Sequence, residues 1–161
     1  MAGRGRPTLI LLCGLPGSGK TTVAKRLAEA VPAVRLCPDD WMAELGIDLF
    51  DVATRVRLER AFWQLAQDLL RLGQSVILES GFWLRSDRDE KRLGARALGA
   101  AVELHYLDVP LDELCRRLEI RNGEATWATA RITREMVEQY APLFQAPDAD
   151  ELDLFDRPPP V

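Results

Sequence analysis

Short apolar segments alternate along the chain with longer segments in which apolar positions recur at helical spacing. Residues 8–13 form a continuous apolar run, which is typical of a strand buried on both faces of a parallel sheet. The same reasoning predicts three further strands and a short last one, over residues 33–37, 75–78, 101–107 and 152–155. The apolar pattern therefore indicates four strands, and the short segment over residues 152–155 is a candidate for a fifth.

The segments between these strands are predicted to be helices. The clearest covers residues 54–72, where large apolar side chains recur at intervals of 4, 3, 4 and 3 and form one stripe. Asp40 is expected to cap a short helix that ends near Leu45, and Ser86 or Asp87 to cap the helix that ends near residue 98. The remaining helices are predicted over residues 20–30, 110–121 and 133–144.

The order of these elements predicts the fold class. Strands that alternate with helices imply an α/β fold, with a parallel sheet and helices on both of its faces. A length of 161 residues fits one domain. Residues 1–6 and 157–161 are expected to be flexible tails of that domain.

Composition and charge exclude several classes of function. The net charge of −4 provides no general attraction to nucleic acids or to anionic membranes. No apolar run approaches the roughly 18 residues that a membrane span needs. The three cysteines, Cys13, Cys37 and Cys115, lie far apart, which argues against a metal site or a disulfide framework. We therefore expect a cytoplasmic protein in a reducing compartment.

One motif in the chain is specific for chemistry. Residues 14–21 read Gly-Leu-Pro-Gly-Ser-Gly-Lys-Thr and match G-x-x-x-x-G-K-[ST] in full, between a predicted buried strand and a predicted helix. Glycines let the backbone approach phosphates closely, and successive N–H groups then form an anion-binding nest. This context disfavours a chance strand-to-helix turn. The residues expected to bind the phosphates of ATP are Gly14, Pro16, Gly17, Ser18, Gly19, Lys20, Thr21 and Thr22.

Two of these residues have particular roles in phosphoryl transfer. Lys20 is expected to act as a point charge for the β- and γ-phosphates, and the Thr21 hydroxyl as a ligand of Mg²⁺. Glu79 follows the third predicted strand, where a Walker B carboxylate would hold a magnesium-bound water. A solvated acid at the end of a strand is an equal alternative for Glu79.

A general base is expected at the carboxyl end of the second predicted strand, because ligands of open α/β sheets bind at those strand ends. Asp39 follows that strand and could accept the proton of an attacking hydroxyl group. The alternative is that Asp39 caps the helix that follows, a role we assign to Asp40.

Two arginines on the predicted helix over residues 110–121 are candidates for charge stabilisation. Arg117 and Arg121 lie near its apolar face and could stabilise the charge on a transferring phosphoryl group. Both are also compatible with favourable charge near a helix C-terminus. The polar segment 122–132, which contains Trp127, is expected to form a lid that excludes water.

The residues after the third strand are candidates for the acceptor site. Phe82 and Trp83 could form an acceptor pocket, or they could belong to the core. Arg85 and Arg88 could contact the acceptor, although a solvated first helical turn also fits them. His105, the only histidine, lies inside a predicted strand and is expected to be structural.

The chain resembles the small P-loop kinases, in particular the group that includes polynucleotide 5′-hydroxyl kinase domains, chloramphenicol phosphotransferases and zeta toxins. The resemblance rests on the phosphate loop, on Cys37-Pro-Asp-Asp-Trp41, on Val76-Ile-Leu-Glu-Ser80 and on residues 114–122. It implies a three-layer P-loop NTPase fold with strand order 2-3-1-4-5 and a small helical lid. It also implies ATP as donor and a hydroxyl group as acceptor.

The resemblance carries over to individual residues. The catalytic carboxylate of the family falls on Asp39, and its lid arginines fall on Arg117 and Arg121. The chain departs from the common pattern at Pro38, where polynucleotide kinases usually have Arg, and at Glu79, where Asp is common. Both departures concern the identity of the acceptor and leave phosphate binding unaffected.

These observations predict an ATP- and Mg²⁺-dependent phosphotransferase that acts on a hydroxyl group of a small molecule. A nucleoside or nucleotide kinase is an alternative, and so is a nucleotide-dependent switch without an acceptor. A polynucleotide 5′-hydroxyl kinase would need a local basic groove. The cluster that could supply one consists of Arg85, Arg88, Lys91, Arg92 and Arg96.

Overall fold

The computed structural model describes residues 5–124 and 131–158. Its strands form one parallel sheet in the order β2-β3-β1-β4. Ile10 of β1 pairs in register with Ile77 of β3 and Glu103 of β4. The parallel α/β class is confirmed, as is the relative order of the first four strands. Their bounds are β1 Thr8–Cys13, β2 Ala33–Leu36, β3 Ser75–Gly81 and β4 Ala101–Tyr106.

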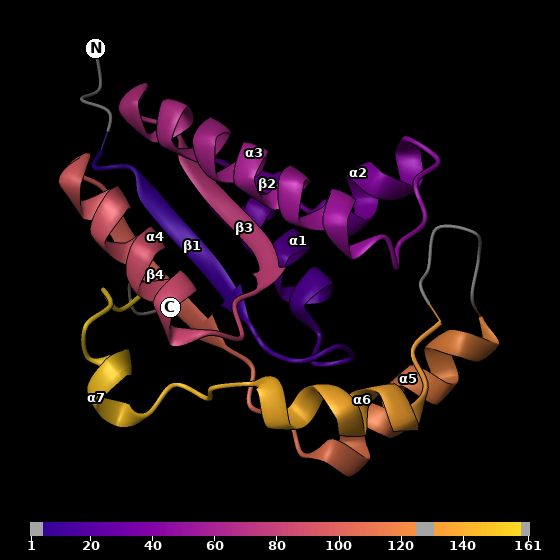
Figure 1. Ribbon diagram of the computed structural model, residues 1–161. Coiled ribbons are helices and arrows are strands. Elements are labelled where there is room, and N and C mark those ends of the chain that lie inside the picture. Colours follow the sequence, from indigo (N-terminus) through magenta and orange to yellow (C-terminus); the bar gives the residue numbers. More distant parts are fainter. Residues whose placement is uncertain (1–4, 125–130, 159–161) are drawn as a thin grey trace.

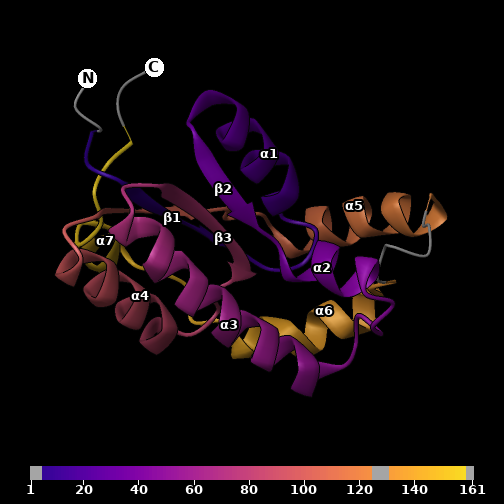
Figure 2. The same cartoon turned by 90° about the horizontal axis from the view of Figure 1, so that it is seen from above.

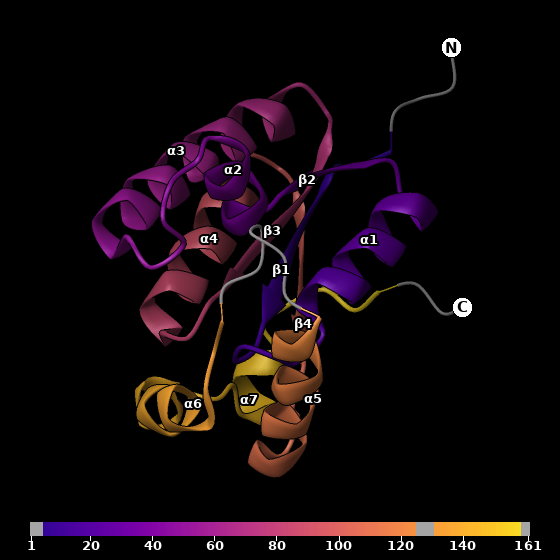
Figure 3. The same cartoon turned by 90° about the vertical axis from the view of Figure 1, so that its right-hand side faces the viewer.

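Helices cover both faces of this sheet. Figure 2 shows α1 on one side of the sheet and α3 with α4 on the other. Helices α5 and α6 lie at the end of the sheet where the strands terminate (Figures 1 and 3). The helix bounds are α1 Lys20–Ala30, α2 Pro38–Glu44, α3 Val52–Arg71, α4 Arg85–Ala97, α5 Leu111–Gly123, α6 Arg134–Tyr140 and α7 Ala149–Leu152, with a 3₁₀ turn at Ala141–Leu143.

The core follows the alternation of side chains along β1. Leu9 and Leu11 point towards α3 and α4 and belong to the larger cluster of buried residues. Ile10 and Leu12 point the other way and pack with Ala24 of α1. A third cluster joins α5 to α6, and Leu15 of the phosphate loop packs against it. Among the helices of the described residues, none is long and apolar enough to cross a membrane.

The predicted fifth strand is not formed, so the sheet has four strands within the described residues. Asp148 caps α7 instead, because its side chain accepts a hydrogen bond from the Glu151 backbone N–H at 2.8 Å. Phe155 then enters the core beside the sheet. One backbone hydrogen bond, from Asp156 N to Val102 O at 2.8 Å, lies along β4 where a fifth strand would pair.

The predicted caps of α2 and α4 are also wrong. Helix α2 begins at Pro38, two residues before Asp40, because proline is preorganised for the first helical turn and has no N–H to satisfy. Helix α4 begins at Arg85, and neither Ser86 nor Asp87 caps it. The Arg85 backbone N–H is satisfied from a distant segment, by Gln145 Oε1 at 2.9 Å.

Candidate active site

The phosphate loop connects β1 to α1 and is packed against α5. Gly17 and Gly19 have φ angles of 83° and 94°, which favour glycine. A Cβ atom at Gly17 would lie 2.9 Å from Leu118 Cγ, and one at Gly14 would lie 2.6 Å from Ser18 Oγ. Glycine is therefore required at Gly17 by both packing and backbone conformation, whereas a Cβ atom at Gly14 would displace the Ser18 hydroxyl group.

Lys20 lies over the loop that precedes it. Its Nζ atom donates hydrogen bonds to Gly14 O at 3.0 Å and Leu15 O at 2.9 Å. Burial lowers the pKa of Lys20 to about 8, and the negative charges of Glu79 and Asp39 oppose this shift. The Ser18 Oγ atom is buried beside the loop and has no hydrogen-bond partner among the described residues. The Lys20 ammonium group can bind the phosphates of a nucleotide. The Ser18 hydroxyl group, which has no partner among the described residues, can bind them as well.

Glu79 lies where the Mg²⁺ site was expected. Its Oε1 atom accepts a hydrogen bond from the Thr21 hydroxyl group, and its Oε2 atom accepts one from Arg35 Nε at 2.8 Å. Glu79 is only 7% exposed, so the alternative of a solvated acid is wrong. Carboxylate and hydroxyl oxygens are the ligands that Mg²⁺ prefers, so these side chains fit the ion.

Arg35, which holds Glu79, was not predicted as part of the site. It also pairs with Asp40 at 2.7 Å, so one guanidinium group links β2, α2 and the end of β3. Arg35 pairs in register with Ile77, and Glu79 lies two residues further along β3 on the same face. A signal was present in the sequence, since Arg35 is the one charged residue within its predicted strand.

Asp39 is held by a second arginine that was not predicted. Arg55 of α3 donates from Nη2 to Asp39 Oδ1 at 2.5 Å and to Leu49 O at 2.9 Å. The Asp39 side chain remains 55% exposed, so a substrate can reach it. Burial lowers the pKa of Arg121, and the Asp39 charge opposes this shift as it does for Lys20. The Asp39 carboxylate therefore lies within electrostatic range of both cations.

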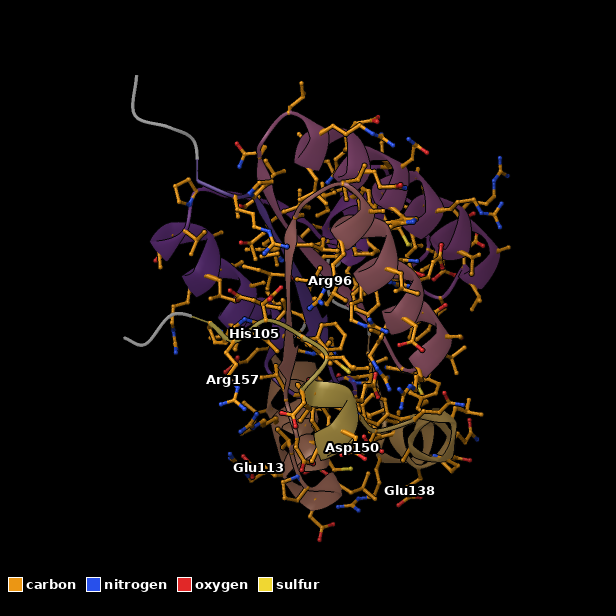
Figure 4. The ribbon with its side chains drawn as sticks, turned by 90° about the vertical axis from the view of Figure 1, so that its left-hand side faces the viewer. Arg96, His105, Glu113, Glu138, Asp150 and Arg157 are labelled. Carbon is orange, nitrogen blue, oxygen red and sulfur yellow. The ribbon has the colours of Figure 1, made fainter. Side chains whose placement is uncertain are left out.

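Arg117 also reaches the phosphate loop. Its Nη1 atom donates to Ser18 O at 3.4 Å, while its Nε atom donates to Glu113 Oε1 at 3.0 Å. The structure thus brings α5 to the loop through both its apolar face and this arginine. Glu113, labelled in Figure 4, anchors the guanidinium group from one turn earlier in the helix.

The segment predicted as a lid begins at the end of α5. Trp127 and the rest of residues 125–130 lie outside the described residues. The two ends of the segment are joined by Asn122, whose Nδ2 atom donates to Ile132 O at 2.7 Å. Asn122 Oδ1 accepts the Ile132 backbone N–H at 3.3 Å in return. The lid remains a prediction, and its two ends are held together by Asn122 and Ile132.

Phe82 and Trp83, in the loop after β3, have different surroundings: Phe82 lies in the core and Trp83 lies against the phosphate loop. Phe82 is 6% exposed, belongs to the core and has a φ angle of 47°, which is rare for a residue with a side chain. Trp83 points towards the phosphate loop, and its Nε1 atom donates to Gly14 O at 3.3 Å. Trp83 also packs against Tyr140 of α6 with ring centroids 5.3 Å apart.

Arg88 is neither solvated nor available to a substrate. It is fully buried and forms an ion pair with Glu151 of α7 at 2.6 Å. Its remaining N–H groups donate to the second carboxylate oxygen of Glu151 and to backbone carbonyl oxygens of the β3–α4 loop and of the segment before α7, so all five are used. These contacts are Phe82 O at 2.8 Å, Trp83 O at 3.2 Å, Gln145 O at 2.7 Å and Glu151 Oε2 at 2.9 Å.

The other cations of α4 do not form a basic groove, because each has an acidic partner. Arg96, labelled in Figure 4, also donates to Leu154 O at 2.6 Å. The pairs are Arg85–Asp89 at 3.5 Å, Lys91–Glu90 at 3.1 Å, Arg92–Asp89 at 3.1 Å and Arg96–Asp156 at 3.6 Å.

His105, labelled in Figure 4, lies within β4. Its Nε2 atom is 2.9 Å from Glu103 Oε2, two residues earlier in the same strand. Glu103 pairs in register with Ile10, whose side chain faces α1. The two side chains therefore lie on the face of the sheet opposite α3 and α4, in agreement with a structural role.

A groove of about 630 Å³ lies between α3 and α4 at the end of β3. Its wall on the α3 side includes Glu59 and Trp63, and its wall on the α4 side includes Asp87. Trp83 lines one end, where it meets the phosphate loop. We call this cavity the α3–α4 groove.

The sequence matches a known family over most of its length. Residues 9–147 match the family model described as an AAA domain. The chain is 32% identical to the bifunctional enzyme NodQ of Azospirillum brasilense over 162 aligned residues, which cover 94% of this chain and 24% of NodQ. It is 30% identical to the cytidylate kinase of Ignicoccus hospitalis over 129 residues, which cover 72% of this chain and 66% of that kinase. The chain thus spans less than two thirds of either relative.

Solved structures share the fold. A chain of the Pnkp1/Rnl/Hen1 RNA repair complex superposes with a TM-score of 0.71 at 24% identity, covering 86% of this chain and 44% of that one. The APS kinase CysC of Mycobacterium tuberculosis, solved in complex with AMPPNP and APS, superposes with a TM-score of 0.56 at 25% identity. That alignment covers 86% of this chain and 97% of the APS kinase.

Proposed function

Because the chain belongs to this AAA-domain family of small P-loop kinases, we propose that it transfers the γ-phosphate of ATP to a hydroxyl group of a small-molecule acceptor. The observation that carries this proposal is the position of Asp39. Its carboxylate is held by Arg55 at 2.5 Å, stays half exposed and acts electrostatically on Lys20 of the phosphate loop. This arrangement supports Asp39 as the base that acts beside the transferring phosphate.

The phosphate loop binds and orients the donor. Its backbone N–H groups and the N-terminus of α1 receive the phosphates, and Lys20 leaves its carbonyl partners in the loop to bind the β- and γ-phosphates. Thr21 and, through a water molecule, Glu79 would hold Mg²⁺, which neutralises phosphate charge when it is bound. Arg35 orients Glu79 towards Thr21 for this role.

The acceptor hydroxyl attacks the γ-phosphorus from the side of Asp39. Asp39 takes the proton of that hydroxyl group as the oxygen–phosphorus bond forms and the bond to the β-phosphate oxygen breaks. Arg117, which touches the loop at Ser18 O, and Arg121 stabilise the negative charge that develops on the phosphoryl group. The acceptor lies over Asp39 and Trp83.

A nucleotide acceptor is the second candidate, favoured by the 30% identity to a cytidylate kinase. A polynucleotide acceptor has less support, because the cations of α4 are neutralised by acidic partners. A switch that binds ATP without an acceptor would show tight binding and no transfer.

The test is transfer of labelled γ-phosphate from Mg·ATP to pooled acceptors. The pools are sugars and polyols, amino sugars, nucleosides and nucleotides, and 5′-hydroxyl oligonucleotides, and Lys20→Ala is the control. Label in a small-molecule pool that is absent with Lys20→Ala supports the proposal. Label confined to oligonucleotides, or ATP binding without transfer to any pool, contradicts it.

A further inference from the structure

The α3–α4 groove has a chemical character that bears on which acceptor the kinase uses. The inference drawn from it rests on the proposed function and narrows it to one class of substrate. The groove lies beside the reacting groups: Glu59 follows Arg55, the residue that holds Asp39, by one turn of α3. At the other end, Trp83 lines the groove and bonds to the phosphate loop. The groove therefore has Arg55, which holds Asp39, one helical turn from its lining at Glu59, and the phosphate loop beside its lining at Trp83.

Two carboxylates line the groove from different helices. Glu59 comes from α3 and Asp87 from the first turn of α4. Burial raises the pKa of Glu59, and the negative charges of Asp87 and Asp39 raise it further. Arg55 and Lys91 oppose that shift. A positive group between Glu59 and Asp87 would relieve their repulsion.

The nearby cations are occupied by other carboxylates. Arg55 is paired with Asp39 at 2.5 Å, and Lys91 is paired with Glu90 at 3.1 Å. Within residues 5–124 and 131–158, neither Glu59 nor Asp87 has an ion-pair partner within 4.0 Å. The remaining cation of the lining, Arg60, is exposed. Two acidic groups are thus left to face a ligand.

The aromatic wall favours the same kind of ligand. The ring of Trp63 already receives a cation, because Lys91 Nζ lies 5.3 Å from its centroid. Phe62, Phe82 and Trp83 extend the aromatic lining. Aromatic faces beside carboxylates bind ammonium groups, since ring quadrupole and negative charge both attract cations. The same surface repels phosphate, sulfate and carboxylate groups.

From this arrangement we infer that the acceptor is an amine-bearing polyhydroxyl compound, such as an amino sugar. Glu59 and Asp87 bind its ammonium group, the aromatic wall covers its apolar face, and one of its hydroxyl groups is directed at Asp39. The volume of about 630 Å³ accommodates more than one sugar ring. Acceptors that carry a negative charge are rejected by the two carboxylates.

Three disaccharides with the same β1→4 linkage test the charge preference directly. The glucosamine disaccharide carries ammonium groups, cellobiose is neutral and cellobiouronic acid is anionic. With Mg·ATP, we expect the KM of the glucosamine disaccharide to be at least about tenfold below that of cellobiose, and that of cellobiouronic acid to be the highest. Equal or better use of cellobiouronic acid or cellobiose would overturn the inference.

Charge-neutral variants of Glu59 and Asp87 test whether these two residues cause the preference for the amine. Glu59→Gln and Asp87→Asn each raise the KM of the glucosamine disaccharide by about tenfold, change that of cellobiose less and leave that of ATP unaltered. Asp68→Asn is the matched control, because Asp68 lies on α3, is exposed and pairs with Arg71 away from the groove. Unchanged amine KM in both groove variants would remove Glu59 and Asp87 from recognition. Thermal melting of each variant checks that it is folded.

Binding without nucleotide separates this inference from the proposed function. Calorimetry with the glucosamine disaccharide and cellobiose needs no phosphoryl transfer. Absence of transfer to every acceptor with ATP affinity intact would contradict the proposed function alone. Failure of the amine to bind more tightly than cellobiose, or binding that Glu59→Gln leaves intact, would contradict the inference alone.

Discussion

The phosphate loop and the α3–α4 groove meet at Trp83, yet they are built in different ways. The loop is one continuous segment, Gly14 to Thr22, and its function resides in its backbone. The glycines that set its conformation, Gly17 and Gly19, lie inside this segment. The groove is assembled from α3, the end of β3 and the start of α4, and side chains provide its chemistry. Donor binding therefore depends on local conformation, whereas acceptor binding depends on how distant segments pack.

This difference explains why similar folds take different acceptors. A phosphate-binding nest needs glycines and a helix N-terminus, so few changes in the loop sequence preserve it. A groove between two helices keeps its shape while its side chains change, so its charge can be altered without loss of the fold. Substitutions in the phosphate loop should accordingly affect ATP binding and transfer, whereas substitutions around the groove should affect acceptor binding or stability.

Lys20→Ala should have the largest effect on activity. Removal of the buried ammonium group takes away a charge aimed at the transferring phosphate, and the expected loss is about 10³-fold in kcat/KM. Steady-state transfer to the best acceptor measures it. Lys25→Ala, on the exposed face of α1, is the matched control and should retain activity. Activity of Lys20→Ala within tenfold of the unaltered protein would mean that the loop does not bind the reacting phosphate.

Arg88→Met should affect the groove through stability. The substitution leaves Glu151 buried without its partner, at a cost of about 3–5 kcal/mol in the free energy of unfolding. Urea unfolding measures this change. Arg85→Met, whose ion pair with Asp89 is exposed, should cost less than about 1 kcal/mol. A similar cost for both variants would show that the buried pair does not hold the β3–α4 loop.

Asp39→Asn should affect the chemical step and spare donor binding. Loss of the base is expected to lower kcat by about 10²-fold, with ATP affinity nearly unchanged. Single-turnover transfer and equilibrium ATP binding separate the two effects. Asp40→Asn, at the neighbouring position of α2, should lower kcat less, because Asp40 contacts Arg35 and lies outside the proposed proton path. Full activity of Asp39→Asn would exclude it as the base.

The pH dependence of ATP binding should show the smallest effect when it is compared over a single pH unit. Burial lowers the pKa of Lys20 from 10.5 to about 8, so the ammonium group is present below pH 8 and is lost as the pH rises above it. ATP affinity should fall by up to about tenfold per pH unit above pH 8, and binding should take up a proton there. Cys13 does not titrate in this range, because burial raises its pKa to about 11.

Calorimetry at pH 8.5 in buffers with different heats of ionisation measures this proton uptake. A binding enthalpy that is independent of the buffer, together with affinity that stays constant from pH 7 to 10, would show that Lys20 keeps its charge without nucleotide.

Several features of the site could be predicted because their causes are local. Gly17 and Gly19 were identified from spacing alone, and the structure gives both the left-handed backbone that the motif requires. Glu79 was placed near Thr21 because parallel strands end at the same edge of a sheet, and the hydrogen bond between the two side chains agrees with this. Arg35 and Arg55 were missed because the sequence does not reveal which carboxylate an arginine will meet.

The sequence by itself determined the parallel α/β fold and the phosphate loop, because apolar periodicity and glycine conformation act within a few residues. Only the tertiary structure decided that Arg88 is buried against Glu151, that residues 152–155 form no strand, and that Glu59 and Asp87 line one groove. Each of these depends on segments that are distant in sequence and meet only in the folded chain. Whether a charged side chain is buried depends on the segments that pack around it, because a charge is buried in the core only when an oppositely charged partner lies beside it.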